Sequence, residues 1–500
     1  MSQTHAGSSD RVVTGTIWVV SARMTVRLIG TASTLFLARL LTPADFGLVA
    51  VAMSVVGLCQ ASTEFGFDLA LIRDSNASEA DYATAWTADL LRGTILAVLL
   101  LLVAKPLATF LNDTRLVALL STLSVIPILE GLYNPRFVDF DKRMQFRPFF
   151  ILMVAVKIIG FMVTVGLALA WRSYWALIFG IIVSNVARLL LSYVLIPYRP
   201  RFTLSSWRKL MGFSGWLAGA QLMGAMGSRL DNVILKKLLT AHGVGIFSVS
   251  RDLTSMAFQE ITLPLRRVLF PALSRLTTAS DAFRHAYFVG VSALFMILAP
   301  IGLGLALVAR DAVPILLGGQ WQDAVYPIQW FSLMAGFWAI TAMAQSAAMS
   351  AGQTRMIFRR NLLYFPIRIT IFILGADYYG LMGAVVCSLI ADVFLGILNL
   401  TMMNRILGTT VLQHVRAFER SLGALLAMAL CVATVQRLIP AGTDLITHGF
   451  RLAAATGVGL LVYPAVHLLL WRVSGRPAGA EQRIIDLLAR RRNNKLTSAQ

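Results

Sequence analysis

Charged residues and cysteines are both scarce in this sequence of 500 residues. Only 14% of the residues are charged, whereas 57% are hydrophobic. A soluble protein of this composition could not cover its surface with polar groups. The three cysteines, Cys59, Cys387 and Cys431, are far apart and lie inside apolar runs, so we expect no disulfide framework. The six histidines are dispersed and show no spacing typical of metal ligands.

Acidic residues are outnumbered by basic ones, 24 against 44. A membrane protein explains this excess better than a nucleic-acid partner does, because Lys and Arg accumulate in the cytoplasmic connections between membrane spans. With the N-terminus inside, alternating connections place most of the basic residues on one side of the membrane. We therefore expect both termini in the cytoplasm and no nucleic-acid partner.

Long polar segments are also missing. Apolar runs of about 20 residues, the length that spans a bilayer as a helix, follow one another with short connections. A β-barrel would instead show alternating segments of about ten residues. We predict an all-α membrane protein with about 14 transmembrane helices, an estimate from apolar run length. The predicted spans include residues 115–135, 324–350, 361–378 and 381–404.

Two stretches of the chain are alike at an offset of 198 residues. Leu37-Ala-Arg-Leu-Leu-Thr42 is followed by Gly47, and Leu235-Lys-Lys-Leu-Leu-Thr240 is followed by Gly245. A duplicated transporter shows such weak internal symmetry, although apolar composition also raises the number of chance matches. We predict two pseudo-symmetric six-helix lobes around a central cavity. The predicted parts are an N-terminal lobe at 1–198, a C-terminal lobe at 211–404, an extra transmembrane helix pair at 420–471, and a basic cytoplasmic tail at 472–500.

Basic residues inside the spans are the strongest indication of function, because a charge at mid-membrane costs about 2.5–3.5 kcal/mol. Arg23 and Arg27 are four residues apart, so they lie on one face of the first span, where like charges repel. An anionic group between them, such as pyrophosphate, would relieve the repulsion and accept bidentate hydrogen bonds. The candidate substrate-binding residues are Arg23, Arg27, Lys157, Arg188, Arg229, Arg251 and Arg368.

Carboxylates inside the spans leave two alternatives open. Glu64, Asp68 or Glu260 could neutralise the arginines without any ligand, as Asp89 and Arg92 are expected to do for each other three residues apart on one helix. A buried carboxylate could also carry a coupling ion, H⁺ or Na⁺. The sequence does not choose among the candidate ion-coupling residues Asp231, Asp252, Glu260 and Asp392. No catalytic residue, metal or other cofactor is expected.

Several motifs resemble those of a known family. The segment 37–48, followed by Glu64-Phe-Gly-Phe-Asp-Leu-Ala-Leu-Ile-Arg73, resembles the first two spans of polysaccharide transporters. These are the Wzx-type flippases of the multidrug/oligosaccharidyl-lipid/polysaccharide superfamily. Ser228-Arg-Leu-Asp-Asn-Val-Ile-Leu235 and 267–275 are similar to the signature of the second lobe. Members of the family place basic residues in the first span and the second lobe, which matches Arg23, Arg27 and Arg229.

The resemblance implies a flippase that moves undecaprenyl-pyrophosphate-linked oligosaccharide across the bacterial inner membrane by alternating access. It implies a role in exopolysaccharide, capsule or O-antigen (lipopolysaccharide) assembly, with membrane lipids, a polymerase and assembly proteins as partners. The extra helix pair is similar to the one that accommodates lipid in the related peptidoglycan-precursor flippase. The alternatives are a multidrug exporter of the same superfamily, a membrane polysaccharide polymerase or transferase, and a non-transporting scaffold. An enzyme would need a large outer loop or a soluble domain, and the sequence shows neither.

Overall fold

The computed structural model describes residues 3–63, 67–74, 76–142, 145–209, 227, 229–277, 280–440, 442, 444–476 and 481–482. All regular structure within these ranges is helical, and the described part contains no strand. Eight of the described helices are long and apolar enough to cross a membrane. The predicted class, an all-α membrane protein, is therefore confirmed. Glu64, Ser228 and most of the predicted tail at 472–500 lie outside the described residues.

The chain divides by its contacts into two compact units, Met1–Ser248 and Val249–Gln500. The boundary falls within a single helix, α11, which begins at Ala241 in the first unit and ends at Ser274 in the second. The lobe boundaries predicted near residues 198 and 404 stay a prediction.

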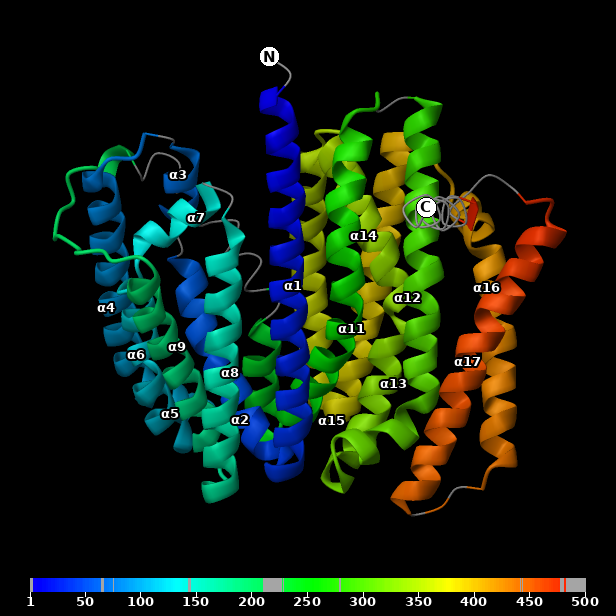
Figure 1. Ribbon diagram of the computed structural model, residues 1–500. Helices are drawn as coiled ribbons and strands as arrows, with labels where there is room; N and C mark the ends of the chain where they lie inside the picture. Colours follow the sequence, from blue (N-terminus) through cyan, green and yellow to red (C-terminus); the bar gives the residue numbers. More distant parts are fainter. Residues whose placement is uncertain are drawn as a thin grey trace, which may run out of the picture. The chain divides into compact units, whose positions relative to one another are not determined.

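In the first unit, α1 packs on α8, α8 packs on α9, and α4 packs on α5 and α6 (Figure 1). A helical stretch at residues 229–238 follows these helices. The helices of the first unit are α1 (Gln3–Leu40), α2 (Pro43–Ser62), α3 (Phe67–Arg73), α4 (Glu79–Phe110), α5 (Arg115–Leu123), α6 (Val125–Gly131), the 3-10 turn η1 (Pro135–Phe137), α7 (Val138–Lys142), α8 (Phe146–Trp171) and α9 (Trp175–Leu195).

In the second unit, α12 is the central helix and contacts α13, α14, α16 and α17. Two long C-terminal helices, α16 and α17, lie side by side (Figure 1). Besides the rest of α11, the elements are α12 (Asp281–Leu316), the 3-10 turn η2 (Gly319–Ala324), α13 (Val325–Leu333), α14 (Ala335–Ser350), α15 (Thr354–Leu407), α16 (Val411–Leu438) and α17 (Leu445–Val473).

Several predicted spans are interrupted or joined in the structure. The predicted span 115–135 is divided into α5 and α6, and 324–350 is divided into α13 and α14. The predicted spans 361–378 and 381–404 are joined in α15, but the backbone at Gly380 is non-helical, with φ 61° and ψ −143°. Side chains hinder this conformation and glycine does not, so Gly380 allows the chain to turn there between the two predicted spans.

Helix starts follow local sequence signals. Thr42 caps α2, because its hydroxyl accepts a hydrogen bond from the Asp45 backbone N–H at 3.3 Å and the Asp45 carboxylate accepts one from the Thr42 backbone N–H at 2.9 Å. This reciprocal arrangement is a capping box, and Pro43 at the first helical position is already held at a helical φ. The same arrangement begins α4 at Ser78 and Asp81. The motif at residues 37–47 therefore includes a helix-start signal.

The two repeat motifs meet at their equivalent glycines. A Cβ atom at Gly47 would lie 1.8 Å from the carbonyl oxygen of Ala241, and one at Gly245 would lie 1.7 Å from the carbonyl oxygen of Pro43. The start of α2 thus packs directly on the start of α11, within the first unit. Because no side chain larger than hydrogen fits at either position, the two glycines allow the close approach of the helices.

Candidate functional site

A polar cavity of about 270 Å³ lies in the first unit, between α2, α3, α4, α6 and α9. Most of the atoms that face it are polar. Gln60 comes from the last turn of α2, Asp68 from α3, Asp89 and Arg92 from α4, and Glu130 from α6. The cavity is therefore assembled from segments that are up to 129 residues apart in the sequence.

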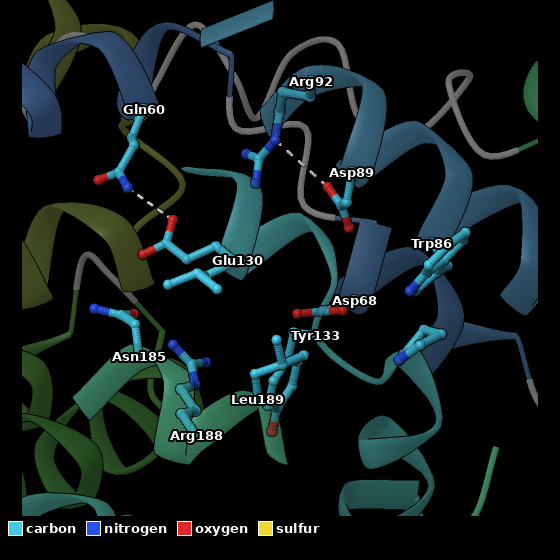
Figure 2. A pocket seen from close by; sticks show the side chains of 12 residues that line it. Gln60, Asp68, Trp86, Asp89, Arg92, Glu130, Tyr133, Asn185, Arg188 and Leu189 are labelled. Atoms are coloured by element: carbon cyan, nitrogen blue, oxygen red, sulfur yellow. Dashed lines mark hydrogen bonds and ion pairs between the residues drawn. The ribbon is translucent and has the colours of Figure 1, made fainter. Parts of the chain in front are cut away.

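A hydrogen bond and an ion pair fix one wall of this cavity (Figure 2). The Gln60 side-chain amide donates a hydrogen bond to Glu130 Oε2 at 2.7 Å. Arg92 Nε lies 3.5 Å from Asp89 Oδ1, one turn apart on α4. The predicted ion pair of Asp89 and Arg92 is thus confirmed. This wall therefore carries hydrogen-bond donors and acceptors, both cationic and anionic. Each of these side chains is oriented by a neighbouring side chain.

The remaining wall comes from α4, the start of the α6–η1 connection, and α9. The Arg188 guanidinium lies 4.6 Å from the centre of the Tyr133 ring. The Trp86 indole N–H donates to the Leu132 carbonyl oxygen at 3.3 Å and to the Tyr193 hydroxyl at 3.1 Å. These contacts set the orientation of the aromatic rings and the guanidinium around the space.

Asn185 contributes an amide to the same cavity, one turn before Arg188 on α9 (Figure 2). Its side-chain nitrogen donates to the Ile181 carbonyl oxygen of its own helix at 2.9 Å. The side-chain oxygen makes no hydrogen bond within the described residues. It is an acceptor at the edge of the cavity.

Of the predicted substrate-binding residues, only Arg188 lines this cavity. The sequence prediction missed Gln60, Trp86, Tyr133 and Asn185, because it counted charges only. The signal that would have indicated two of them is the presence of uncharged amide side chains inside apolar runs.

A second group of predicted residues lies on α1 and α8, which pack side by side (Figure 1). Arg23 is exposed and Arg27 is partly buried. On α8, the Lys157 side chain reaches α1, where its Nζ lies 3.5 Å from the position that a Cβ at Gly30 would occupy. Gly30 is three residues after Arg27 and so lies on the same face of α1. The structure therefore brings Lys157 within about one helical turn of Arg27.

Lys157 has no hydrogen bond or ion pair within the described part of the chain. Its ammonium group is partly buried between two apolar helices. An unpaired cation in such surroundings is costly, so a ligand anion at this place would stabilise it.

Arg229 and Asp231 lie at the start of the helical stretch 229–238. The Arg229 guanidinium packs where Gly57 of α2 leaves room, because a Cβ at Gly57 would lie 2.0 Å from Nη1. Arg229 Nη1 also donates to the Met53 carbonyl oxygen at 3.3 Å. Asp231 is fully buried. Arg229 is therefore held against α2 by its hydrogen bond to a backbone carbonyl and by the space that Gly57 leaves for its guanidinium.

In the second unit, three predicted residues come together. The charges of Arg251 and Arg368 both act on Asp392. Arg368 is buried, and the Tyr364 hydroxyl donates to Asp392 Oδ1 at 3.4 Å. Two predicted substrate-binding arginines therefore share a neighbourhood with one predicted ion-coupling carboxylate.

The other two predicted ion-coupling residues of this unit lie on α11. Asp252 is exposed and Glu260 is partly buried. Both take part in interactions with other residues.

An apolar groove of about 340 Å³ lies between α12, α16 and α17. Gly304 of α12 and Gly459 of α17 leave the space open, and Met428 of α16 is its nearest side chain at both glycines. Tyr463 closes one part and donates its hydroxyl to the Met296 carbonyl oxygen at 2.8 Å. The lining is largely apolar, which suits a hydrocarbon ligand.

Asp113, in the connection between α4 and α5, is the centre of an ion-pair cluster. It accepts hydrogen bonds from Arg115 Nε and Nη2, both at 2.9 Å, and lies 3.1 Å from Lys236 Nζ. The hydrogen bond with Arg115, followed by the bond and charge of Lys236, lowers the pKa of the Asp113 carboxyl to about 2. This cluster joins the helical stretch 229–238 to the end of α4.

Comparison with known proteins identifies a family match, related sequences and structures with the same fold. Residues 36–326 match the model of a family described as polysaccharide biosynthesis protein. The chain is 22% identical to the lipopolysaccharide biosynthesis protein WzxC of Escherichia coli (strain K12) over 411 residues, 81% of this chain and 84% of that protein. It is 26% identical to the succinoglycan biosynthesis transport protein ExoT of Rhizobium meliloti (strain 1021) over 446 residues, 87% and 88% of the two chains.

Among solved structures, the lipid II flippase MurJ in an inward closed conformation superposes with a TM-score of 0.74 at 13% identity, covering 92% of this chain and all of that one. An inward-facing multidrug resistance transporter of the MATE family gives a TM-score of 0.60 at 13% identity, covering 77% and 98%. These likenesses show that the fold is shared with both proteins. Because the family model covers more than half of the sequence, this multi-pass helical membrane protein belongs to the polysaccharide biosynthesis protein family.

Proposed function

We propose that this protein is a flippase that moves a lipid-linked oligosaccharide across the bacterial inner membrane by alternating access. The observation that carries the proposal is the cationic group of Arg23, Arg27 and Lys157 on the packed pair α1 and α8, in a chain whose relative ExoT is named as a transport protein. The role would be to supply repeat units for exopolysaccharide, capsule or O-antigen assembly.

The head of the carrier lipid is the part that the cations recognise. A pyrophosphate carries two or more negative charges, and arginine can bind it through two parallel N–H donors. Arg23 and Arg27 occupy one face of α1, and the Lys157 ammonium lies beside the same face. We expect the pyrophosphate to bind between these three groups. Arg229, which packs against α2, would not contact it there.

The isoprenoid tail would occupy the apolar groove between α12, α16 and α17. Gly304 and Gly459 leave this groove open, and it belongs to the helix pair that follows the predicted second lobe. The tail would enter this groove from the bilayer, which is equally apolar, so van der Waals packing against the lining rather than the hydrophobic effect would retain it while the head crosses.

Coupling to H⁺ or Na⁺ would use Asp392. Asp392 lies beside the predicted substrate-binding residues Arg251 and Arg368, and it accepts a hydrogen bond from the Tyr364 hydroxyl. Loading of the carboxylate would change the charge that the arginines experience, and so link ion binding to head-group binding. Both termini would lie in the cytoplasm, and a polymerase and assembly proteins would receive the product.

A multidrug exporter is the second candidate, and one observation favours it. The polar cavity of the first unit contains three carboxylates and two aromatic residues, which is chemistry that attracts organic cations. An exporter would lower the accumulation of a cationic dye such as ethidium in cells, and a flippase would leave it unchanged.

The proposed function is tested by deletion in the source bacterium. We expect lipid-linked oligosaccharide to accumulate on the inner leaflet and surface polysaccharide to fall. Expression of the wild-type chain should restore the polymer, whereas the double variant Arg23→Gln/Arg27→Gln should not. Normal polymer in the deletion strain, together with increased ethidium accumulation, would reject the flippase and support the exporter.

A further inference from the structure

We propose that the polar cavity between α2, α4, α6 and α9 binds a sugar ring of the transported oligosaccharide. The proposal rests on the proposed function for its ligand and adds a second recognition site to it. The cations of α1 and α8 would hold the pyrophosphate, and this cavity in the first unit would hold part of the glycan.

The lining has the mixture of groups that sugar hydroxyls require. Each hydroxyl donates one hydrogen bond and accepts two, so it is best satisfied between an acceptor and a donor. Asp68, Asp89 and Glu130 supply acceptors, and Arg92 and Arg188 supply donors. Acidic and basic groups face the same space and are not segregated by charge (Figure 2).

Two amides add neutral partners to these charges. Gln60 donates from its nitrogen to Glu130 at 2.7 Å and so fixes the orientation of that carboxylate at the cavity wall. Asn185 is fixed by its bond to Ile181 and offers its side-chain oxygen as an acceptor. Amide side chains can orient a sugar hydroxyl through a hydrogen bond without adding net charge to the cavity.

Aromatic rings complete the lining. Trp86 and Tyr133 both face the cavity, and a planar ring packs well against the apolar C–H face of a pyranose. The Trp86 indole N–H is already bonded to the Leu132 carbonyl and the Tyr193 hydroxyl. The ring is therefore held in one orientation before any ligand arrives.

Charge and size argue against a phosphate or a large ligand in this cavity. Three carboxylates repel a phosphate, so the pyrophosphate itself is disfavoured here. Within the described residues, no three His, Cys, Asp or Glu side chains are placed to hold a metal ion. A volume of about 270 Å³ is close to the lower limit of roughly 300 Å³ for small-molecule pockets, which suits a single sugar ring.

The test measures binding of a glycan that has no lipid. The probe is the oligosaccharide released by mild acid from lipid-linked repeat units of the source bacterium, titrated calorimetrically into the purified full-length protein in detergent. We expect saturable binding by the wild type. Asn185→Leu removes an acceptor from the cavity and Gln60→Leu removes the hydrogen bond that orients Glu130, and each should weaken binding at least tenfold. Leu190→Ala, on an exposed position of the same helix α9, is the matched control and should bind as the wild type does.

The outcomes separate this proposal from the proposed function. If the wild type binds the glycan but moves no lipid-linked oligosaccharide in vesicles, the cavity assignment stands and the flippase is rejected. If the wild type moves the lipid but binds no free glycan, or if both variants bind it as tightly as Leu190→Ala, the cavity assignment is rejected and the flippase stands. Melting temperatures of all variants within a few degrees of the wild type would show that lost binding is not lost folding.

Discussion

Gly47 and Gly245 hold equivalent places in the two repeat motifs, and each lies against the backbone beside the other. A methyl group at Gly47 would lie 1.8 Å from the Ala241 carbonyl oxygen, which is backbone and cannot move aside cheaply. The start of α11 would have to shift away from α2. The close approach of the two helix starts thus depends on one glycine, which has no side chain, on each helix.

We predict that Gly47→Ala destabilises the protein by about 1–3 kcal/mol, the usual cost of adding a methyl group to a packed interior. The apparent melting temperature in detergent measures the effect. Gly166→Ala in α8 is the control, because a Cβ at Gly166 has no atom within 4 Å. Equal melting temperatures for the two variants would show that the helices are not in contact here.

Asp113 leads to a prediction with a defined pH range. Because its folded-state pKa of about 2 is below the ordinary value of aspartate, ionised Asp113 stabilises the folded state at neutral pH. The stabilisation is complete above about pH 5 and is lost as the pH falls toward 2. We expect Asp113→Asn to cost about 1 kcal/mol at pH 7, after allowance for solvent screening.

The difference in melting temperature between Asp113→Asn and the wild type should therefore shrink between pH 5 and pH 3. Asp377→Asn is the control, since Asp377 is exposed and has no ion pair among the described residues. A difference for Asp113→Asn that stays constant over this range would mean that the Arg115 and Lys236 contacts do not depend on its charge.

The groove formed by α12, α16 and α17 makes the proposed role of the C-terminal helices testable. A leucine at Gly304 would project into the groove toward Met428, whose flexible methyl group can give way. We expect Gly304→Leu to lower transport of a carrier with a full-length isoprenoid tail at least fivefold. A carrier analogue with a short tail should be moved at the wild-type rate, because it does not need the groove. Equal loss for both carriers would show that the substitution damages the protein generally.

At the level of elements, sequence patterns predicted where apolar helices occur but not where they break. Length and hydropathy indicate a span, and the Thr42 and Ser78 capping boxes indicate helix starts. The separation of α5 from α6 was missed although it falls at Ser124, three residues before Pro127, which lacks the backbone N–H that a continuous helix would need. The backbone at Gly380 was easier to anticipate, because a glycine lies in the short gap between two predicted spans.

The candidate site was only partly predictable for a related reason. Arg23, Arg27 and Lys157 are conspicuous because a charge in an apolar run is costly, and the proximity of Lys157 to α1 needed the structure. The polar cavity joins Gln60 to Glu130 and Asn185, which are far apart in the sequence. Long-range packing of this kind leaves no periodic pattern, so the amides were overlooked.

In the whole molecule, the proposed function depends on two different chemical environments within one membrane protein. Each compact unit contributes a different environment, a polar cavity in the first and an apolar groove in the second. A substrate with a charged and sugar-bearing head and a long hydrocarbon tail matches both. A soluble sugar-binding protein would not need the second environment.

Transport in reconstituted vesicles tests the central claim most directly. Lipid-linked oligosaccharide from the source bacterium is placed in vesicles with the protein, and the share of head groups that a membrane-impermeant oxidant reaches is followed in time. The account predicts rapid exposure of inner-leaflet head groups by the wild type, at least a tenfold loss for Arg23→Gln/Arg27→Gln, and partial activity for Arg23→Lys/Arg27→Lys. Movement by the glutamine variant at the wild-type rate, or no movement by the wild type, would contradict it.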